Sequence, residues 1–188
     1  MPPQEIATQR LLLSPPQLAD ARQIIKLAND PLIAQWTLSV PSPYTEADAI
    51  FFLNMAHEKR KEDQAYIFAI RLPDEPTLMG CIGLHRDTKY GTAELGYWMG
   101  APYRRQGYVS EAVGALIDFG FRHTEVPRIY AMHIEGNEPS GRALLANGLQ
   151  YEARLEDHSV KNGAAQTALQ YRILRREWER GRKQKGEE

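Results

Sequence analysis

Apolar residues in the first third of the chain are spaced as in one short strand followed by two helices. Arg10–Leu13 is an apolar run that ends at Ser-Pro-Pro, which stops a strand. Over Leu18–Ala28 the apolar residues recur at helical spacing up to an Asn-Asp-Pro stop signal. Thr45–Lys59 repeats this spacing, and Thr45 and Asp48 can form a capping pair at its start. Residues 34–44 follow neither pattern, which predicts a loop with a single helical turn.

The middle of the chain changes to short strand-like runs. Ala65–Arg71, Thr77–Arg86 and Thr92–Met99 are separated by turn residues, and their spacing predicts an antiparallel meander. Gly107–His123 is expected to be a helix, because its apolar residues share one face. That face consists of Val109, Val113, Leu116, Ile117 and Gly120.

The last part of the chain predicts a strand, a short helix and a hairpin. Arg128–Ile134 is rich in β-favouring residues, and Ser140–Asn147 is typical of a short helix closed by a glycine. Tyr151–Val160 and Gln166–Leu174 are joined through an Asn-Gly pair, the strongest short hairpin signal in the sequence. The order of elements therefore predicts an α+β fold, a mixed sheet with one strand–helix–strand crossover near its centre.

Length and composition are those of an ordinary globular chain. The 188 residues, of 21.4 kDa, suffice for about one domain. A hydrophobic fraction of 43% and a charged fraction of 25% exclude a fibrous or wholly disordered chain. We expect residues 1–178 to form a single domain, and residues 179–188, rich in alternating charge and glycine, to form a solvated C-terminal tail.

Charge and cysteine content narrow the partners and the compartment. Lys and Arg number 23 against 24 Asp and Glu, so the formal net charge is -1 and neither nucleic acid nor a membrane is expected as a partner. The apolar runs are far shorter than the ~20 residues that span a bilayer, and the N-terminus does not resemble a secretory signal. The single cysteine predicts a cytoplasmic protein. No Cys-x-x-Cys or His-x-x-x-His spacing occurs, so no metal site is expected.

The most informative segment is the basic turn before the helix at Gly107. Arg104 and Arg105 lie just before the glycine at which this helix opens. The free backbone N–H groups and the macrodipole of a helix N-terminus bind anions, and glycine lets a phosphate approach closely. The pattern indicates a site for a phosphorylated ligand, in particular a diphosphate. The same residues also fit an ordinary helix start with two solvated arginines.

Several motifs resemble one enzyme family. Arg104-x-x-Gly107-x-Val109 resembles the acetyl-CoA pyrophosphate loop of the GNAT N-acetyltransferases, whose pattern is Q/R-x-x-G-x-G/A. Residues 93–99 resemble the fourth strand of that family, and residues 137–140 its later N-x-x-S segment. The opening residues 8–13, followed by Asp20 and Asn-Asp-Pro, resemble the ribosomal-protein N-acetyltransferase branch, which acts on N-terminal alanine or serine. The resemblance covers essentially the whole chain.

This resemblance implies a fold, a reaction and a cofactor site. The fold would be a GNAT-like, mostly antiparallel central sheet of about six to seven strands flanked by helices. The reaction would be acyl-CoA-dependent N-acyl transfer, from acetyl-CoA as co-substrate and without a metal, to a primary amine on a protein N-terminus or a small molecule. A homodimer is possible by analogy. The residues that the resemblance assigns to acetyl-CoA are Tyr97, Trp98, Met99, Arg104, Arg105, Gln106, Gly107, Tyr108, Val109, Ser110 and Asn137.

Two residues depart from the family pattern. Val109 stands where the family prefers glycine or alanine, and it would crowd the loop. Leu144 stands where many members carry a tyrosine that protonates the leaving thiolate. These departures leave open a second hypothesis, a catalytically silent GNAT-like domain that binds CoA or another protein. A dinucleotide-binding or methyltransferase domain is disfavoured, because no G-x-G-x-x-G motif is present.

Glu94 and Ser140 are the predicted catalytic residues. Strand alternation places Glu94 on one face with Gly96 and Trp98, where partial burial would raise its pKa and suit a general base. A surface or ion-paired glutamate is the alternative. Ser140 is expected to cap the short helix, and its hydroxyl could also relay the proton to the leaving thiolate in place of the missing tyrosine.

Trp36 and His85 are predicted to line the pocket for the acceptor amine. Trp36 lies in the loop between two helices, a usual place for pocket residues, although core packing is an equal alternative. His85 ends the middle strand, and a structural histidine is the alternative for it. Cys81, flanked by glycines on the same strand face as His85, is expected to pack as a small hydrophobe.

Overall fold

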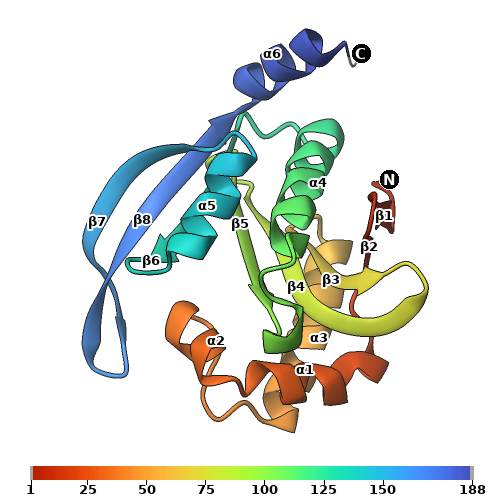
Figure 1. The fold of residues 1–188 in the computed structure, drawn as a ribbon, viewed down its shortest axis with the longest axis vertical. Coiled ribbons are helices and arrows are strands. Elements are labelled where there is room, and N and C mark those ends of the chain that lie inside the picture. The colour runs from red at the N-terminus through yellow and green to blue at the C-terminus, as the bar shows by residue number, and fades with distance from the viewer. Residues whose placement is uncertain (1, 187–188) are drawn as a thin grey trace.

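The computed structural model describes residues 2–186 and arranges them around an eight-stranded sheet (Figure 1). Within this range the strands follow the order β1-β2-β3-β4-β5-β6-β8-β7, and every neighbouring pair is antiparallel except β5 and β6. The bounds are β1 (Ile6–Ala7), β2 (Leu12–Ser14), β3 (Ala65–Leu72), β4 (Glu75–Asp87), β5 (Thr92–Met99), β6 (Arg128–Ile134), β7 (Gln150–Lys161) and β8 (Ala164–Leu174). The predicted meander, crossover and α+β class are confirmed. The strand count exceeds the expected six to seven because two-residue β1 is too short to show alternation.

Six α-helices surround the sheet in the described part of the chain. Their bounds are α1 (Ala21–Ala28), α2 (Pro31–Trp36), α3 (Glu46–Lys61), α4 (Tyr108–His123), α5 (Glu138–Ala146) and α6 (Arg175–Lys185), with short 3-10 turns η1 (Leu18–Asp20) and η2 (Ala101–Tyr103). The predicted capping pair before α3 is confirmed, because the Asp48 carboxylate accepts from the Thr45 amide and the Thr45 hydroxyl accepts from the Asp48 amide.

Helix α2 is longer than the single turn that the sequence predicts. It begins inside the Asn-Asp-Pro segment that ends α1, because the same residues that stop one helix can start another. Asp30 caps α2 by accepting a 2.9 Å hydrogen bond from the Leu32 amide, and Pro31 takes the first helical position, where its missing N–H is harmless.

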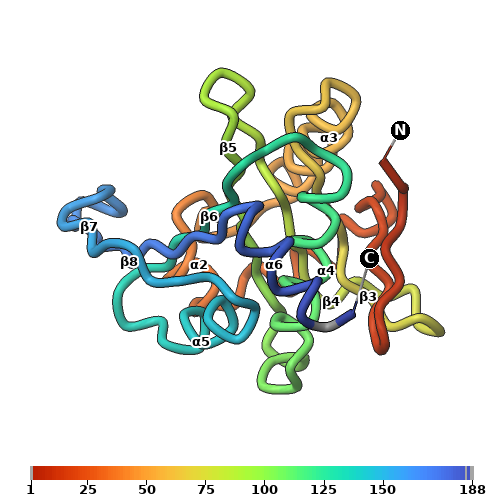
Figure 2. The backbone as a smooth tube through the Cα atoms, turned by 90° about the horizontal axis from the view of Figure 1, so that it is seen from above, coloured from red at the N-terminus to blue at the C-terminus, as the bar shows by residue number. Residues whose placement is uncertain are grey.

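Helices on the two faces of the sheet create two separate packing layers. On β3, Tyr66, Phe68 and Ile70 pack in the cluster that contains α4, whereas Ala69 packs in the cluster of α1 and α3. Period-2 alternation explains this division, since successive side chains of a strand point to opposite faces. Because both faces are covered, β3 is buried almost along its whole length. The view in Figure 2 shows α3 and α4 on either side of the central strands.

A buried ion pair ties the N-terminal region to the sheet. The Arg71 guanidinium on β3 donates to both carboxylate oxygens of Asp20, at 2.9 and 2.7 Å, and to the Ser14 hydroxyl at 3.0 Å. Paired and hydrogen-bonded in this way, the two charges escape the penalty of unpaired burial. The contact fixes where α1 starts, and hence the direction of the loop that follows it.

The C-terminal end differs from the expected tail. Strands β7 and β8 form a long arm that turns at Asn162 and Gly163, both left-handed, as a two-residue hairpin requires (Figure 1). Helix α6 then continues to Lys185, so a helix occupies most of the segment 179–188 that the sequence presents as a solvated tail. Glu177 caps this helix by accepting a 3.0 Å bond from the Leu174 amide. Residues 1, 187 and 188 of the predicted domain and tail lie outside the described residues.

Candidate active site

Strands β5 and β6 separate in the middle of the sheet. Strand β5 pairs with β4 from Thr92 to Met99, but it pairs with β6 only from Thr92 to Leu95. Beyond Leu95, the edge of β5 that faces β6 has no ladder partner among the described residues. Backbone N–H and C=O groups need hydrogen-bond partners, so such an edge can bind an extended ligand by main-chain hydrogen bonds.

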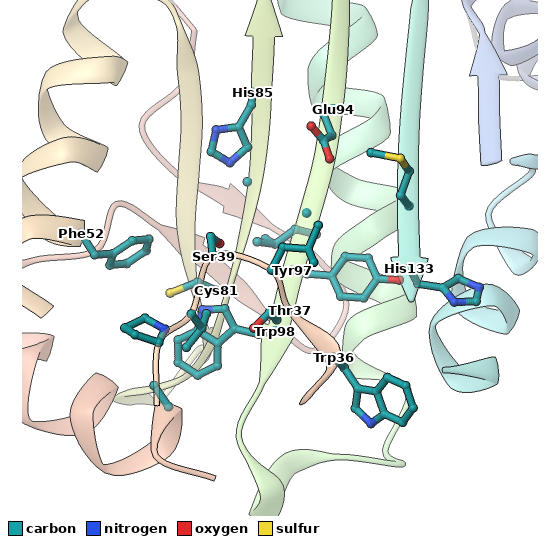
Figure 3. A pocket seen from close by; sticks show the side chains of 18 of the residues that line it. Trp36, Thr37, Ser39, Phe52, Cys81, His85, Glu94, Tyr97, Trp98 and His133 are labelled. Carbon is teal, nitrogen blue, oxygen red and sulfur yellow. The ribbon is translucent and has the colours of Figure 1, made fainter. Parts of the chain in front are cut away.

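A pocket of about 540 Å³ opens on the α1 and α3 face of the sheet beside this separation. Its walls come from α3, the loop between α2 and α3, strands β4 to β6, and the β7–β8 arm. Figure 3 shows that Glu94 and His85 point into one end of the pocket, whereas Trp98 and Trp36 lie toward the other end. With Tyr97, which also lines the pocket, the structure therefore brings five of the predicted site residues together around one space.

Glu94 and His85 face each other across neighbouring strands. They are directly opposed in the β4–β5 register. Burial raises the pKa of the Glu94 carboxyl, although a 3.4 Å hydrogen bond from Tyr130 and the nearby His158 oppose the shift. Burial, together with the charge of Lys59, lowers the pKa of the His85 imidazole, which keeps it neutral at pH 7. The pair thus places a proton-accepting carboxylate beside a neutral imidazole.

Tyr97 joins the opposite face of β5 to helix α5. Its phenol oxygen lies 2.7 Å from the Ser140 hydroxyl, and burial raises the pKa of Tyr97 to about 12. Ser140 does not cap α5 as the sequence suggests; Asn137 holds the N-cap position and Ser140 is the third helical residue. The error arises because Pro139 fits inside the first turn, so the helix starts before it. The Asn137 side chain does not cap the helix, and the residue is half-buried.

The basic turn before α4 has the backbone form of an anion site. Gly107 is the N-cap with φ 81°, and Arg105 is also left-handed with φ 62°. Successive turns of this kind gather N–H groups at a helix N-terminus, where the macrodipole favours negative charge. A Cβ added at Gly107 would come within 3.2 Å of the Arg10 guanidinium, so this cation lies beside the turn. Glu111 fixes Arg10 through a 2.7 Å ion pair.

Arg104 is engaged inside the protein. Its Nε donates to the Met99 carbonyl at 2.9 Å, and its Nη2 forms a 2.7 Å ion pair with Asp30. These contacts tie the turn to the end of β5 and to the start of α2. The side chain is 28% exposed. Arg104 therefore shapes the turn, and the phosphate contact that the resemblance implies for it stays a prediction.

The neighbouring predicted residues adopt several different roles. Val109 packs against the main core, so its side chain does not fill the turn as the sequence suggests. Ser110 accepts hydrogen bonds from the Asn147 amide at its carbonyl, 2.9 Å, and at its hydroxyl, 3.1 Å, which joins α4 to α5. Gln106 donates to the Pro102 carbonyl at 3.1 Å, and the Tyr108 ring lies under the Arg10 guanidinium.

The end of α2 and the loop that follows it, together residues 34–40, form the roof of the pocket and are called the roof loop below. Trp36, at the end of α2, lies close to Gly136, where an added Cβ would come 3.4 Å from the indole. The Lys161 ammonium reaches across from the β7–β8 arm and donates to the carbonyls of Ala34, Thr37 and Val40, the last at 3.1 Å. A single cation therefore fastens the pocket roof from the far edge of the sheet, and burial lowers the pKa of this lysine.

Other predicted features of the site are located as follows. Met99 is buried in the main core, and Trp98 packs against α1 and α3 while lining the pocket. Cys81 is buried opposite Trp98, and burial raises the pKa of its thiol, which keeps it protonated. No group of three or more His, Cys, Asp or Glu side chains suited to a metal is found among residues 2–186. Over the same range, no helix is long and apolar enough to cross a membrane.

The chain matches the family model for the acetyltransferase (GNAT) domain over residues 10–150. It belongs to the GNAT acetyltransferase family. It is 30% identical to the uncharacterized N-acetyltransferase p20 of Bacillus licheniformis, over 91% of this chain and 96% of that protein. It is 26% identical to the [ribosomal protein uS5]-alanine N-acetyltransferase of Escherichia coli, over 69% and 68%. The microcin C7 self-immunity acetyltransferase MccE, solved with acetyl-CoA and AMP, has a TM-score of 0.78 at 22% identity, over 89% and 93%.

Family membership makes this chain an N-acetyltransferase, and GNAT enzymes use acetyl-CoA. The residues present fit that co-substrate. The unpaired edge of β5 offers main-chain groups to an extended arm, and the turn at Gly107 offers N–H groups to a diphosphate. Leu144 is fully buried in the core, so the side chain at this position provides no acid.

Three contacts at this site are not predicted from the sequence. The resemblance assigns Tyr97 to acetyl-CoA, but it does not indicate that the Tyr97 hydroxyl contacts Ser140. The signal available was its alternation, which turns it away from Glu94 toward the helix face, where a buried phenol needs a partner. Arg10 and Lys161 act across 96 and 127 residues of sequence separation, respectively, and no local pattern reveals such contacts.

Proposed function

We propose that this enzyme acetylates the α-amine at the N-terminus of a protein or peptide, with Glu94 as the general base. The observation that carries the proposal is the half-buried Glu94 carboxylate at the end of the pocket, beside the separation of β5 and β6. The relative that is named a ribosomal-protein alanine N-acetyltransferase supports an α-amine as acceptor.

The acceptor amine must lose a proton before it attacks the acetyl carbonyl. A carboxylate whose pKa is raised by burial is a stronger base than an exposed one, so Glu94 can take this proton directly or through water. Neutral His85, opposite Glu94, can hold such a water by hydrogen bonding. These two side chains together orient the amine and receive its proton.

The carbonyl oxygen gains negative charge during attack and requires donors. Main-chain N–H groups of Tyr97 and Met99, which strand alternation directs to the unpaired edge of β5, would supply them, and their fixed positions would make them effective. The turn from Arg104 to Gly107 would hold the phosphate part of the co-substrate, and Asn137 at the start of α5 would hold the pantetheine part. Acetyl-CoA supplies the thioester bond that breaks.

The leaving thiolate needs a proton, and Ser140 with Tyr97 can deliver it. The high pKa of Tyr97 keeps its phenol protonated at neutral pH, so it can donate to the Ser140 oxygen. The Ser140 hydroxyl would then donate its own proton to sulfur. This two-hydroxyl relay would take the place of the tyrosine that Leu144 replaces.

Glu94→Gln tests the base. We expect kcat/KM for a peptide acceptor to fall by at least about tenfold, while the affinity for acetyl-CoA in calorimetry stays unchanged. The control is Glu58→Gln, which changes an exposed carboxylate on α3. The wild-type kcat/KM should rise with pH through the raised pKa of Glu94, because only the ionised carboxylate accepts a proton. This rise of kcat/KM with pH should be absent in the variant. If Glu94→Gln keeps the wild-type kcat/KM, Glu94 is not the general base.

A further inference from the structure

The acceptor pocket is mainly apolar along the wall opposite Glu94 and His85. Phe52 and Met55 of α3, Leu38 and Val40 of the roof loop, and Trp98 of β5 contribute this surface. Figure 3 shows Phe52 and Trp98 around the same space that Glu94 enters from the other end. Contact between this wall and an apolar part of the acceptor makes the free energy of binding more favourable. Covering a polar part without a hydrogen-bond partner makes it less favourable.

Apart from three histidines, the pocket-lining side chains that carry a charge near pH 7 are acidic. Glu94 stands at the inner end, and Asp48 of α3 lies on the wall, its pKa lowered by hydrogen bonds from Thr45. No lysine or arginine is among the pocket-lining residues of the described chain. Lys161 lies above the roof, but its ammonium is occupied by three loop carbonyls. The pocket thus attracts an ammonium group and repels a carboxylate.

The pocket also continues toward the opening between the strands. Gly96 and Tyr97 of β5 and Met132 and Ile134 of β6 line it, and these residues flank the point at which the strands part. An amine placed at Glu94 therefore lies beside the unpaired edge, while the group that bears it occupies the apolar part. The amine of the acceptor and the group that carries it therefore bind in two different regions of one pocket.

We infer that the acceptor presents its amine on an apolar or aromatic body with no carboxylate beside the amine. This inference rests on the proposed function and specifies its acceptor. Two sources share this chemistry: the first residue of a peptide with a large apolar side chain, and a small arylalkylamine. A free amino acid is disfavoured, because its α-carboxylate would lie next to Glu94.

The test compares acceptors that differ in one group, with release of the CoA thiol as the readout. Phenylethylamine and phenylalanine differ only by the carboxylate, and phenylethylamine is the more basic amine, which biases the comparison against the expected result. We expect kcat/KM for phenylethylamine to exceed that for phenylalanine by at least about tenfold. Among peptide amides, one that begins with phenylalanine should exceed one that begins with aspartate by a similar factor. The faster of phenylethylamine and the phenylalanine peptide identifies the source.

A charge added at the pocket mouth provides a second test. Phe51 lines the pocket and is 71% exposed, so Phe51→Arg should fold normally. We expect this variant to reduce the preference for phenylethylamine over phenylalanine several-fold, because an added positive charge at the mouth offsets part of the repulsion that the acidic side chains exert on the carboxylate. The matched control is Leu18→Arg, which changes a leucine that is 63% exposed and does not line the pocket. It should leave the ratio of kcat/KM for phenylethylamine and phenylalanine unchanged.

The outcomes separate the two proposals. A kcat/KM for the aspartate peptide equal to or above that for the phenylalanine peptide would overturn the inference while leaving the proposed function standing. A kcat/KM for phenylalanine equal to or above that for phenylethylamine would also overturn the inference. If no amine raises thiol release above the rate without acceptor, the proposed function itself fails, and the inference fails with it.

Discussion

The hydroxyl groups of Tyr97 and Ser140 lie 2.7 Å apart and connect strand β5 to helix α5. The two side chains come from opposite sides of the opening between β5 and β6, and Tyr97 also lines the acceptor pocket. A hydrogen bond at this place joins the two elements that would flank the reacting groups. Removal of either hydroxyl should therefore change the turnover number of the enzyme.

Tyr97→Phe and Ser140→Ala should each lower kcat by about 10- to 100-fold, because each breaks the proposed proton relay. Residues that act as one unit give non-additive losses, so the double variant should be about as slow as the slower single variant. Steady-state kinetics on all three proteins checks this, with Tyr90→Phe, an exposed tyrosine, as control. Losses that multiply in the double variant would mean that the two hydroxyls act independently.

Gly107→Ala should weaken CoA binding by at least about tenfold, since the added methyl group lies 3.2 Å from the Arg10 guanidinium, on the surface of the turn that the phosphates would approach. Gly91→Ala is a matched control. Gly91 is also left-handed, with φ 67°, but an added Cβ there meets nothing within 4 Å. Both variants should lose about 1 kcal/mol of unfolding free energy from backbone strain. Calorimetry should show weakened CoA binding in Gly107→Ala alone; equal affinities would remove the anion site from this turn.

Arg104→Ala and Asp30→Asn should weaken CoA binding to a similar degree, because both break the 2.7 Å ion pair that holds the turn. A partly buried pair is screened little by salt, so the loss should be nearly the same at low and high ionic strength. Titrations with CoA at two salt concentrations check this. If the Arg104→Ala loss shrinks strongly with salt and Asp30→Asn binds normally, Arg104 contacts the phosphates directly.

Lys161→Met should raise the KM for the acceptor several-fold and leave the affinity for acetyl-CoA unchanged. Its ammonium holds three carbonyls of the roof loop, and without it the loop that carries Trp36 loses its fastening. Lys161→Arg, which keeps the donors, should recover part of the loss. Lys89→Met, in the exposed turn after β4, is the control. An unchanged acceptor KM in Lys161→Met would show that the roof is held by other contacts.

Most helices and strands could be predicted from the sequence. Their signals, namely the spacing of apolar residues, the helix caps and the turn residues, each lie within a short stretch of the chain. Thr45 with Asp48 and the Asn-Gly turn of the β7–β8 arm are examples. The predicted helix boundaries were wrong where the same residues can either end a helix or begin one. The Asn-Asp-Pro segment both ends α1 and starts α2, and Pro139 lies within α5 rather than before it.

The candidate site was less predictable than the fold. Alternation placed Glu94 and His85 on pocket-facing sides of their strands, but their direct opposition depends on the β4–β5 register, which the turn between them sets. The Arg104 ion pair with Asp30 joins segments 74 positions apart, so a motif could not show that this arginine faces inward. Contacts of this kind arise only once the chain has folded.

The parting of β5 from β6 bears on how such an enzyme can diverge. An unpaired edge made of main-chain groups is present whatever side chains the strand carries, provided that pairing with β6 ends at the same residue. Substitutions at residues 97–99 can then alter packing and selectivity without erasing the edge. The sequence at these positions can therefore change while the fold is kept. MccE, which has a similar fold at 22% sequence identity, shows a divergence of this size.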